Sequence, residues 1–281
     1  MTRAAAPTRR SALGLDARRP RGATGLAVAG VLLGALLALL VWPPAAWLAR
    51  AAAVASGERL LLADARGTLW SGSAVLVLAG GPGSRDAAAL PGRLHWTLGL
   101  DGLALAVTLR QDCCTGRTLA LRVDGGLGRL RVALPPPADA EAALGQWPMQ
   151  ALAGLGTPWN TLAPRGTMTL ASPGFAAESV KGRWRFSGRL EVALRGAGSR
   201  LTTLPVLGDY RLTVQSRDDG GATLALATDQ GALQLSGQGE WAPRLRFRGQ
   251  ASALPEAEAA LANLLNIIGR RQGAVSLISI G

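Results

Sequence analysis

Few residues in this chain could do chemistry. His95 is the single histidine of 281 residues, and Cys113 and Cys114 are its two cysteines. Zinc and iron–sulfur sites need several such ligands, and a catalytic triad needs a histidine beside a nucleophile. The sequence also contains no Gly-x-Ser-x-Gly turn and no Gly-x-x-x-x-Gly-Lys phosphate loop. We therefore expect no catalytic, cofactor-binding or metal-binding residues, and no enzyme activity.

The adjacent cysteines are the one unusual local feature. In an oxidising compartment Cys113 and Cys114 can form a strained ring with each other or reach outward to another chain. They lie in a loop, Gln111–Gly116, that suits a disulfide at a corner or two inert thiols. A Cys113–Cys114 disulfide is thus one hypothesis among these, and a redox site is the least favoured.

The formal net charge of +12 raises the question of nucleic-acid binding. All but one of the 30 basic residues are arginine, which indicates a general preference for that residue. In Arg183-Trp184-Arg185-Phe186 the arginines and aromatic residues alternate, so a strand would send them to opposite faces. Single-strand binding needs both on one face, and we therefore expect no nucleic-acid partner.

The elements that would position these residues begin with an apolar N-terminal segment. Residues 23–42 carry no charge and match the ~20 residues with which a helix crosses a membrane. The six arginines up to Arg21 place an arginine-rich tail, residues 1–22, in the cytoplasm and the rest of the chain on the far side. The alternative is a cleaved signal peptide ending at Ala53-Val54-Ala55, but this apolar stretch is longer than a usual signal core.

A small-residue spacing lies inside this predicted span. Gly30 and Gly34 form a Gly-x-x-x-Gly pattern that lets a second helix approach closely. The pattern indicates helix–helix contact and self-association, although an Ala- and Gly-rich span without a partner would show it too.

The residues after the span are predicted to form strands. The 37 glycines and 16 prolines indicate many turns. In Arg93–Arg110, Asp101-Gly102 is a preferred two-residue hairpin turn. That turn would pair Leu98 with Leu105 and Trp96 with Val107, and would put His95 beside Thr108 on the polar face.

The same apolar–polar alternation continues to the C-terminus, so we predict a mainly β fold. It would be a transmembrane helix followed by an antiparallel meandering sheet, either a sandwich or a curled groove, with one or two short helices. Apolar residues at helical spacing between Pro255 and Gly269 predict one of these helices. The expected organisation is a first sheet half at 43–134, a Pro- and Ala-rich linker or short helix at 135–163, and a second half at 164–281 that contains the helix 256–269.

Several segments resemble one protein family when they are taken in order. They are Gly67-Thr68-Leu69-Trp70-Ser71-Gly72, Gly182-Arg183-Trp184 with Gly188-Arg189-Leu190, Leu204 to Leu212, and Leu261 to Arg271. Together with the short cytoplasmic tail and single span, they are similar to protein N of the bacterial type II secretion system. The vicinal cysteines and the long arginine tail have no counterpart in that pattern.

The resemblance implies a bitopic accessory subunit of the secretion machine in the cell inner membrane, with its bulk in the periplasm. It implies contacts with other type II secretion subunits, namely the inner-membrane platform and, as a further candidate, the outer-membrane secretin. It brings no catalytic residues. The alternative is a periplasmic lipid-binding or lipid-transfer groove of the AsmA-like kind, which an apolar sheet face without a facing layer would favour and a sealed sandwich would oppose.

Overall fold

The structure is a computed structural model that describes residues 21–137, 143–241 and 244–281, without the side chains of 21–24 and 40. The chain divides into two compact units, Met1–Trp42 and Pro43–Gly281. Each unit is described by itself.

In its described residues, the first unit contains one helix, α1 (Arg21–Val41). The backbone N–H of Trp42 still donates to the carbonyl of Ala38, at 2.8 Å. The predicted span 23–42 falls within this segment, and the predicted tail 1–22 lies outside the described residues except at its end. No helix among the described residues combines the length and the hydropathy needed to cross a membrane.

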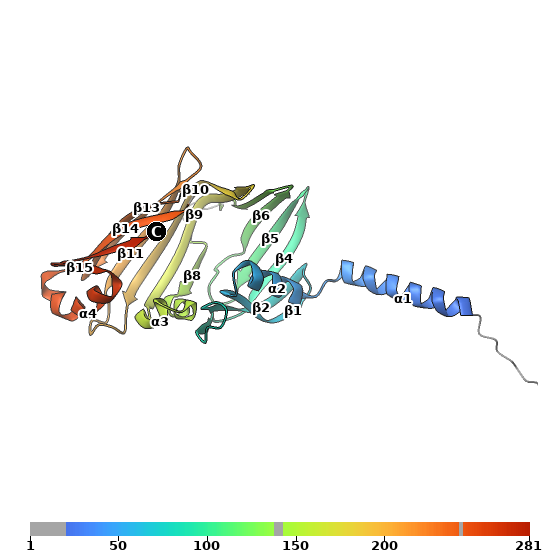
Figure 1. The fold of residues 1–281 in the computed structure, drawn as a ribbon, viewed down its shortest axis with the longest axis horizontal. Helices are drawn as coiled ribbons and strands as arrows, with labels where there is room; N and C mark the ends of the chain where they lie inside the picture. Colours follow the sequence, from blue (N-terminus) through green and yellow to red (C-terminus); the bar gives the residue numbers. More distant parts are fainter. Residues whose placement is uncertain (1–20, 138–142, 242–243) are drawn as a thin grey trace, which may run out of the picture. The chain divides into compact units, whose positions relative to one another are not determined.

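The described residues of the second unit form one antiparallel sheet of 16 strands with short helices (Figure 1). The predicted mainly β, antiparallel fold with a few short helices is thus confirmed. The helices are α2 (Ala45–Ala55), η1 (Met149–Leu155), α3 (Trp159–Leu162), η2 (Pro255–Ala257) and α4 (Glu258–Ile268). The strands are β1 (Leu60–Gly67), β2 (Ser71–Ala79), β3 (Ala87–Ala89), β4 (Leu94–Asp101), β5 (Ala104–Gln111), β6 (Leu119–Gly126), β7 (Arg129–Leu134), β8 (Gly145–Pro148), β9 (Arg165–Val180), β10 (Arg183–Gly198), β11 (Gly208–Ser216), β12 (Ala222–Gly231), β13 (Leu233–Trp241), β14 (Leu245–Ala253), β15 (Arg270–Gln272) and β16 (Val275–Ile280).

The strand order follows the chain almost without exception, from β1 at one end of the sheet to β15 at the other. The sheet is therefore open, and its two end strands do not pair with each other. The long strand β9 carries two partners on one edge: β7 pairs with residues 175–180, and β8 pairs with residues 167–170. The predicted linker 135–163 thus contains β8, η1 and α3, while residues 138–142 lie outside the described part.

The β4–β5 hairpin forms where it was predicted, but its register was wrong by two residues. Leu98 lies opposite Val107, and Trp96 lies opposite Leu109. The turn residues are Gly102 and Leu103, with Gly102 at a positive φ of 64°, because glycine fits the first central position of a tight hairpin turn. A shift of two residues keeps every side chain on its predicted face, since the side-chain period of a strand is two.

Strands β9 and β10 bend at a bulge near Gly188. The register shifts between Arg189 and Glu191, and Gly188 has a φ of 92°. A Cβ at this position would collide with the carbonyl of Gly174 on β9. The buried hydroxyl of Ser172 donates to the carbonyl of Arg189 at 2.6 Å, and it satisfies a backbone group that the bulge leaves unpaired.

Two apolar clusters lie on the same face of the sheet. In the first, Ala45 and Leu48 of α2 pack on Ala74, Trp96 and neighbouring residues of β1, β2, β4 and β5. In the second, α4 buries three leucines against β9–β14 and β16: Leu261, Leu264 and Leu265. These helices cover part of the sheet face, and the described part of the chain provides no second sheet.

Candidate functional site

The single histidine faces outward and contacts a carboxylate. Its Nε2 lies 3.1 Å from Oδ2 of Asp112, and both side chains are nearly half exposed. Hydrogen bonds from His95 and then Arg110 hold the pKa of the Asp112 carboxyl below its ordinary value. Because of the two-residue register shift, His95 lies opposite Arg110 instead of Thr108. Within the described residues, no three His, Cys, Asp or Glu side chains are arranged to hold a metal ion.

The cysteines lie in the loop between β5 and β6 and are joined to each other in the structure. Cys114 is buried, and its carbonyl accepts a hydrogen bond from the backbone N–H of Gln146 on β8 at 2.7 Å. Nearby, the indole N–H of Trp147 donates to Oε1 of the buried Gln111 at 2.9 Å. The loop therefore connects β5 to the edge of β8 that does not pair with β9. We interpret this as a structural role of the loop.

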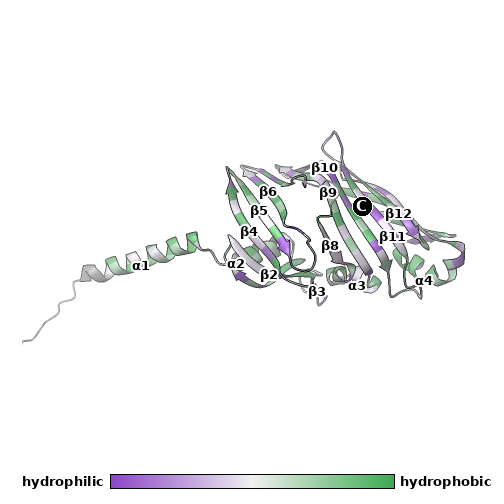
Figure 2. Ribbon diagram, turned by 180° about the vertical axis from the view of Figure 1, so that it is seen from behind, coloured by the Kyte–Doolittle hydropathy of each residue, from purple (hydrophilic) through white to green (hydrophobic). Residues whose placement is uncertain are grey.

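The most informative feature for function is that the sheet has one apolar face and one charged face. The register of the strand pairs places most of the large apolar side chains on one side, here called the apolar face. Exceptions on the other side are Leu61, Val75 and Val77 of β1 and β2 and Leu277 of β16. Along β9–β12 the alternation of apolar and polar residues is visible in Figure 2. Across the sheet this face includes Leu62, Leu76, Trp96, Leu98, Val107, Leu121, Val132, Phe186, Val192, Leu212, Leu224 and Phe247.

The opposite face carries arginines paired with carboxylates on nearby strands. Arg93 contacts Asp64 at 2.8 Å, and its hydrogen bond, followed by that of Arg66, lowers the pKa of Asp64. Similar pairs join Arg129 to Glu178 at 2.6 Å and Arg211 to Asp229 at 3.1 Å. Such exposed pairs stabilise a fold little, but they identify this side as the solvent face.

Aromatic contacts show that the apolar face is concave. The rings of Phe186 on β10 and Trp241 on β13 have centroids 5.6 Å apart. Three strand spacings separate these strands, which would be about 14 Å in a flat sheet. Phe175 on β9 stacks on Phe186 at 6.1 Å and extends the cluster. The sheet therefore curls toward its apolar side in this region.

Among the described residues, neither apolar cluster extends over one part of the apolar face. Neither apolar cluster contains a described residue of β6 or β7. We call the uncovered region between α2 and the aromatic cluster the open strip. Its side chains are half-buried or exposed, and they are Leu100, Leu105, Val107, Leu121, Val123, Leu130 and Val132.

One end of the strip is a row of hairpin turns with exposed apolar residues. Leu103 in the β4–β5 turn and Leu127 in the β6–β7 turn are fully exposed. Leu100, at the end of β4, is also exposed, as is Trp184 at the start of β10. Apolar turn residues at one end of a sheet form an exposed patch of the kind that marks interaction sites.

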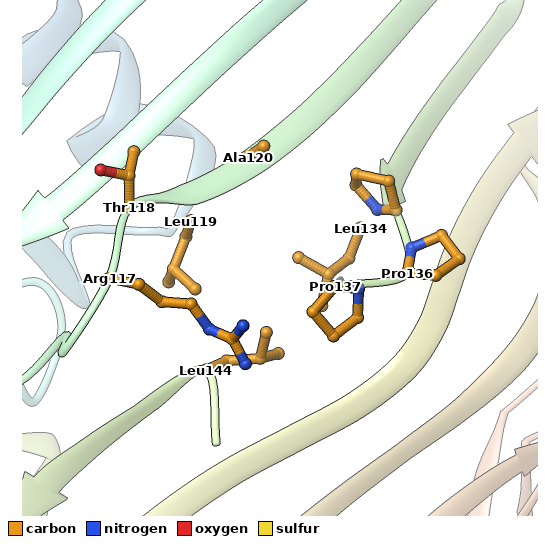
Figure 3. A pocket seen from close by; sticks show the side chains of 9 residues that line it. Arg117, Thr118, Leu119, Ala120, Leu134, Pro136, Pro137 and Leu144 are labelled. Carbon is orange, nitrogen blue, oxygen red and sulfur yellow. The ribbon is translucent and has the colours of Figure 1, made fainter. Parts of the chain in front are cut away.

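The other end of the strip reaches a small pocket at the fork between β7 and β8. The pocket has a volume of about 180 Å³ and is lined by Leu119, Leu134, Leu144, Arg117 and the prolines 135–137. Figure 3 shows the Arg117 side chain directed toward Leu144, opposite Pro137. The prolines at the start of the predicted linker 135–163 thus form one wall of the pocket.

Sequence reasoning predicted the apolar and charged faces, but not the open strip. Alternation shows that one side of a strand is apolar, and it does not show whether another layer covers that side. The prediction left a sandwich and a curled groove open. The described residues form a single sheet, which curls toward its apolar side near Phe186 and Trp241. A Cβ at Gly30 or Gly34 of α1 would meet no atom within 4 Å. The contacts within this chain therefore do not test the predicted helix pairing, which stays a prediction.

Comparison with known proteins gave one family. A family model described as type II secretion system (T2SS), protein N, matches residues 58–277. No curated protein and no solved structure matches the chain.

Proposed function

The chain belongs to the protein N family of the type II secretion system, and from this we propose that it is a non-enzymatic accessory subunit of that machine. It would support the export of folded proteins from the periplasm across the outer membrane by contacting other subunits. The observation that carries this proposal is the extent of the family match, which runs from just before β1 into β16.

In this proposal residues 23–42 anchor the chain in the inner membrane, and residues 43–281 lie in the periplasm. The support comes from the sequence: an uncharged apolar segment preceded by six arginines. Protease added to intact spheroplasts should then digest the region after Trp42, while an N-terminal tag stays protected. N-terminal sequencing of the mature chain would show whether a cleaved signal peptide replaces the anchor.

The proposed partners are the inner-membrane platform and the outer-membrane secretin. Contact surfaces are available at the end strands β1 and β15, whose outer edges have no partner strand in the described sheet. In the anchor, Gly30 and Gly34 would permit self-association, which Gly30→Leu and Gly34→Leu should weaken in a membrane two-hybrid assay.

The experiment that tests the function combines deletion of the gene with recovery of the tagged chain from crosslinked membranes. Secreted enzymes should accumulate in the periplasm of the deletion strain, and plasmid-borne wild-type chain should restore their export. The tagged chain should recover platform or secretin subunits. Unchanged secretion together with no recovered secretion subunit would rule the proposal out.

A further inference from the structure

We propose that the open strip is a lipid-binding surface that takes the acyl chains of a phospholipid. This goes beyond the role of the chain as a secretion subunit, since that role requires only protein contacts. The proposal follows from the chemistry of the strip, its length, and the charge and exposure of its turn end.

The lining of the strip has the chemistry of hydrocarbon. Its members on β5, β6 and β7 are leucines and valines, and the charged residues of these strands lie on the opposite face. Leu121, for example, faces the strip, whereas Arg122 faces solvent and pairs with Asp124 at 3.3 Å. A ligand on this surface would therefore meet only apolar side chains, which suits an acyl chain.

The length of the strip fits such a chain. Strand β6 has eight residues, which correspond to about 26 Å at 3.3 Å per residue. The acyl chains of one leaflet span about half of the ~30 Å hydrocarbon core. An acyl chain can thus lie along β6 from the turn end toward the pocket at Leu119 and Leu134.

Charge at the turn end complements a phosphate headgroup. On the outer side of the β6–β7 hairpin, a shallow hollow of about 580 Å³ is lined by Arg122, Arg129, Arg131 and Asp124. Arg122 pairs with Asp101 and Asp124, and Arg129 pairs with Glu178, so the positive charge in excess of these pairs comes from Arg131. Arg183, the first residue of β10, lies level with Arg129, because both are paired with Val180 of β9. Basic residues next to an apolar surface favour anionic lipid.

The exposed turn residues provide an entry route for a lipid. Leu103 and Leu127 project fully from the turns that border the strip. Trp184 is exposed at the same end, and indole rings favour the boundary between headgroups and hydrocarbon. These three side chains would contact a bilayer while an acyl chain moves onto the strip.

The test is photocrosslinking of the full-length chain in living cells. The variants Leu121→p-benzoylphenylalanine and Val132→p-benzoylphenylalanine place a probe on the strip. Matched controls, Ala106→p-benzoylphenylalanine and Thr108→p-benzoylphenylalanine, place the same probe on the outer face of β5, away from the hollow and the pocket. The chain is purified after irradiation, and the adduct is identified by mass spectrometry.

We expect strip probes to shift the mass of the chain by one phospholipid and outer probes to give no such shift. A polypeptide adduct at the strip, from a second copy or another subunit, would overturn the proposal. So would the absence of a lipid adduct, or equal adducts on both faces. If a strip variant loses the protease resistance of the wild type, Leu105→p-benzoylphenylalanine or Val123→p-benzoylphenylalanine replaces it. The secretion assay is scored separately, so that failure of lipid binding is distinct from failure of the secretion role.

Discussion

At the scale of single residues, polar side chains stabilise backbone at the places where strands bend or end. Asp209 is the clearest example, because its carboxylate accepts from the backbone N–H of Gly196 at 2.7 Å and from Gln230 at 2.9 Å. These bonds, with a smaller contribution from Arg195, hold the pKa of Asp209 below its ordinary value. They lie where the β10–β11 register shifts, so Asp209 fixes the bulge.

The variant Asp209→Asn should lower the free energy of unfolding by about 1 kcal/mol at pH 7, because a neutral amide replaces a charged acceptor. The depressed pKa means that this stabilisation is present above the unfolded carboxyl value of about 3.9 and is lost as pH falls through the folded value. Urea unfolding of both chains over a falling pH series should therefore converge. A difference that persists at acidic pH would contradict this, and Asp218→Asn, in an exposed turn, is the control.

The second residue-scale prediction concerns the vicinal cysteines. Because the structure joins Cys113 to Cys114 within one chain, the non-reduced protein should take up no alkylating reagent and should migrate as a monomer on a denaturing gel. After reduction it should take up two labels, which intact mass spectrometry would count. Labelling without reduction, or a dimer that reductant dissolves, would point to free thiols or an interchain bond.

At the scale of elements, α4 is the main cover of the apolar face. Its Leu261 side chain is completely buried against the sheet. Ser276 Oγ on β16 donates to the carbonyl of Leu265 at 2.7 Å. The helix was predictable because its apolar residues recur at helical spacing. Helix α2 was not predicted, since its Ala-rich sequence continues the apolar stretch before it and has no capping side chain.

The variant Leu261→Ala should destabilise the fold by about 3 kcal/mol, because it removes buried methyl groups and leaves a cavity. The matched change Ile267→Ala, at an exposed position of the same helix, should cost no more than about 0.5 kcal/mol. Urea midpoints of the full-length variants provide the comparison. Equal losses of unfolding free energy in the two variants would mean that α4 does not pack on the sheet as described.

At the scale of the whole molecule, the face of each strand followed from the sequence, but the cover of each face did not. The two-residue period assigns Leu98, Val107 and Leu121 to one side whatever the register. Whether that side meets a helix, a second sheet or solvent depends on contacts between distant segments, which alternation does not encode. The hairpin register failed for a similar reason, because turn type decides which residues pair.

A further prediction at the scale of the whole molecule concerns the turn end of the sheet. Leu103→Asn and Leu127→Asn change fully exposed side chains, so the fold should be kept, while the phospholipid adduct at a probe in position 121 should fall. Val206→Asn, at an exposed position in the β10–β11 loop at the opposite end of the strands, should leave the adduct unchanged. Equal adducts in all three variants would show that the turns play no part in lipid entry.

The near-perfect agreement between strand order and chain order has a consequence for biogenesis. Each strand finds its main partner in the segment made just before it, so the edge of the growing sheet is a ready template for the next hairpin as the chain emerges from its N-terminus. Assembly could then proceed by stepwise addition, without waiting for the C-terminus. The last step would be the arrival of β16, which follows α4 in the chain, pairs with β14 and completes the surface on which α4 packs.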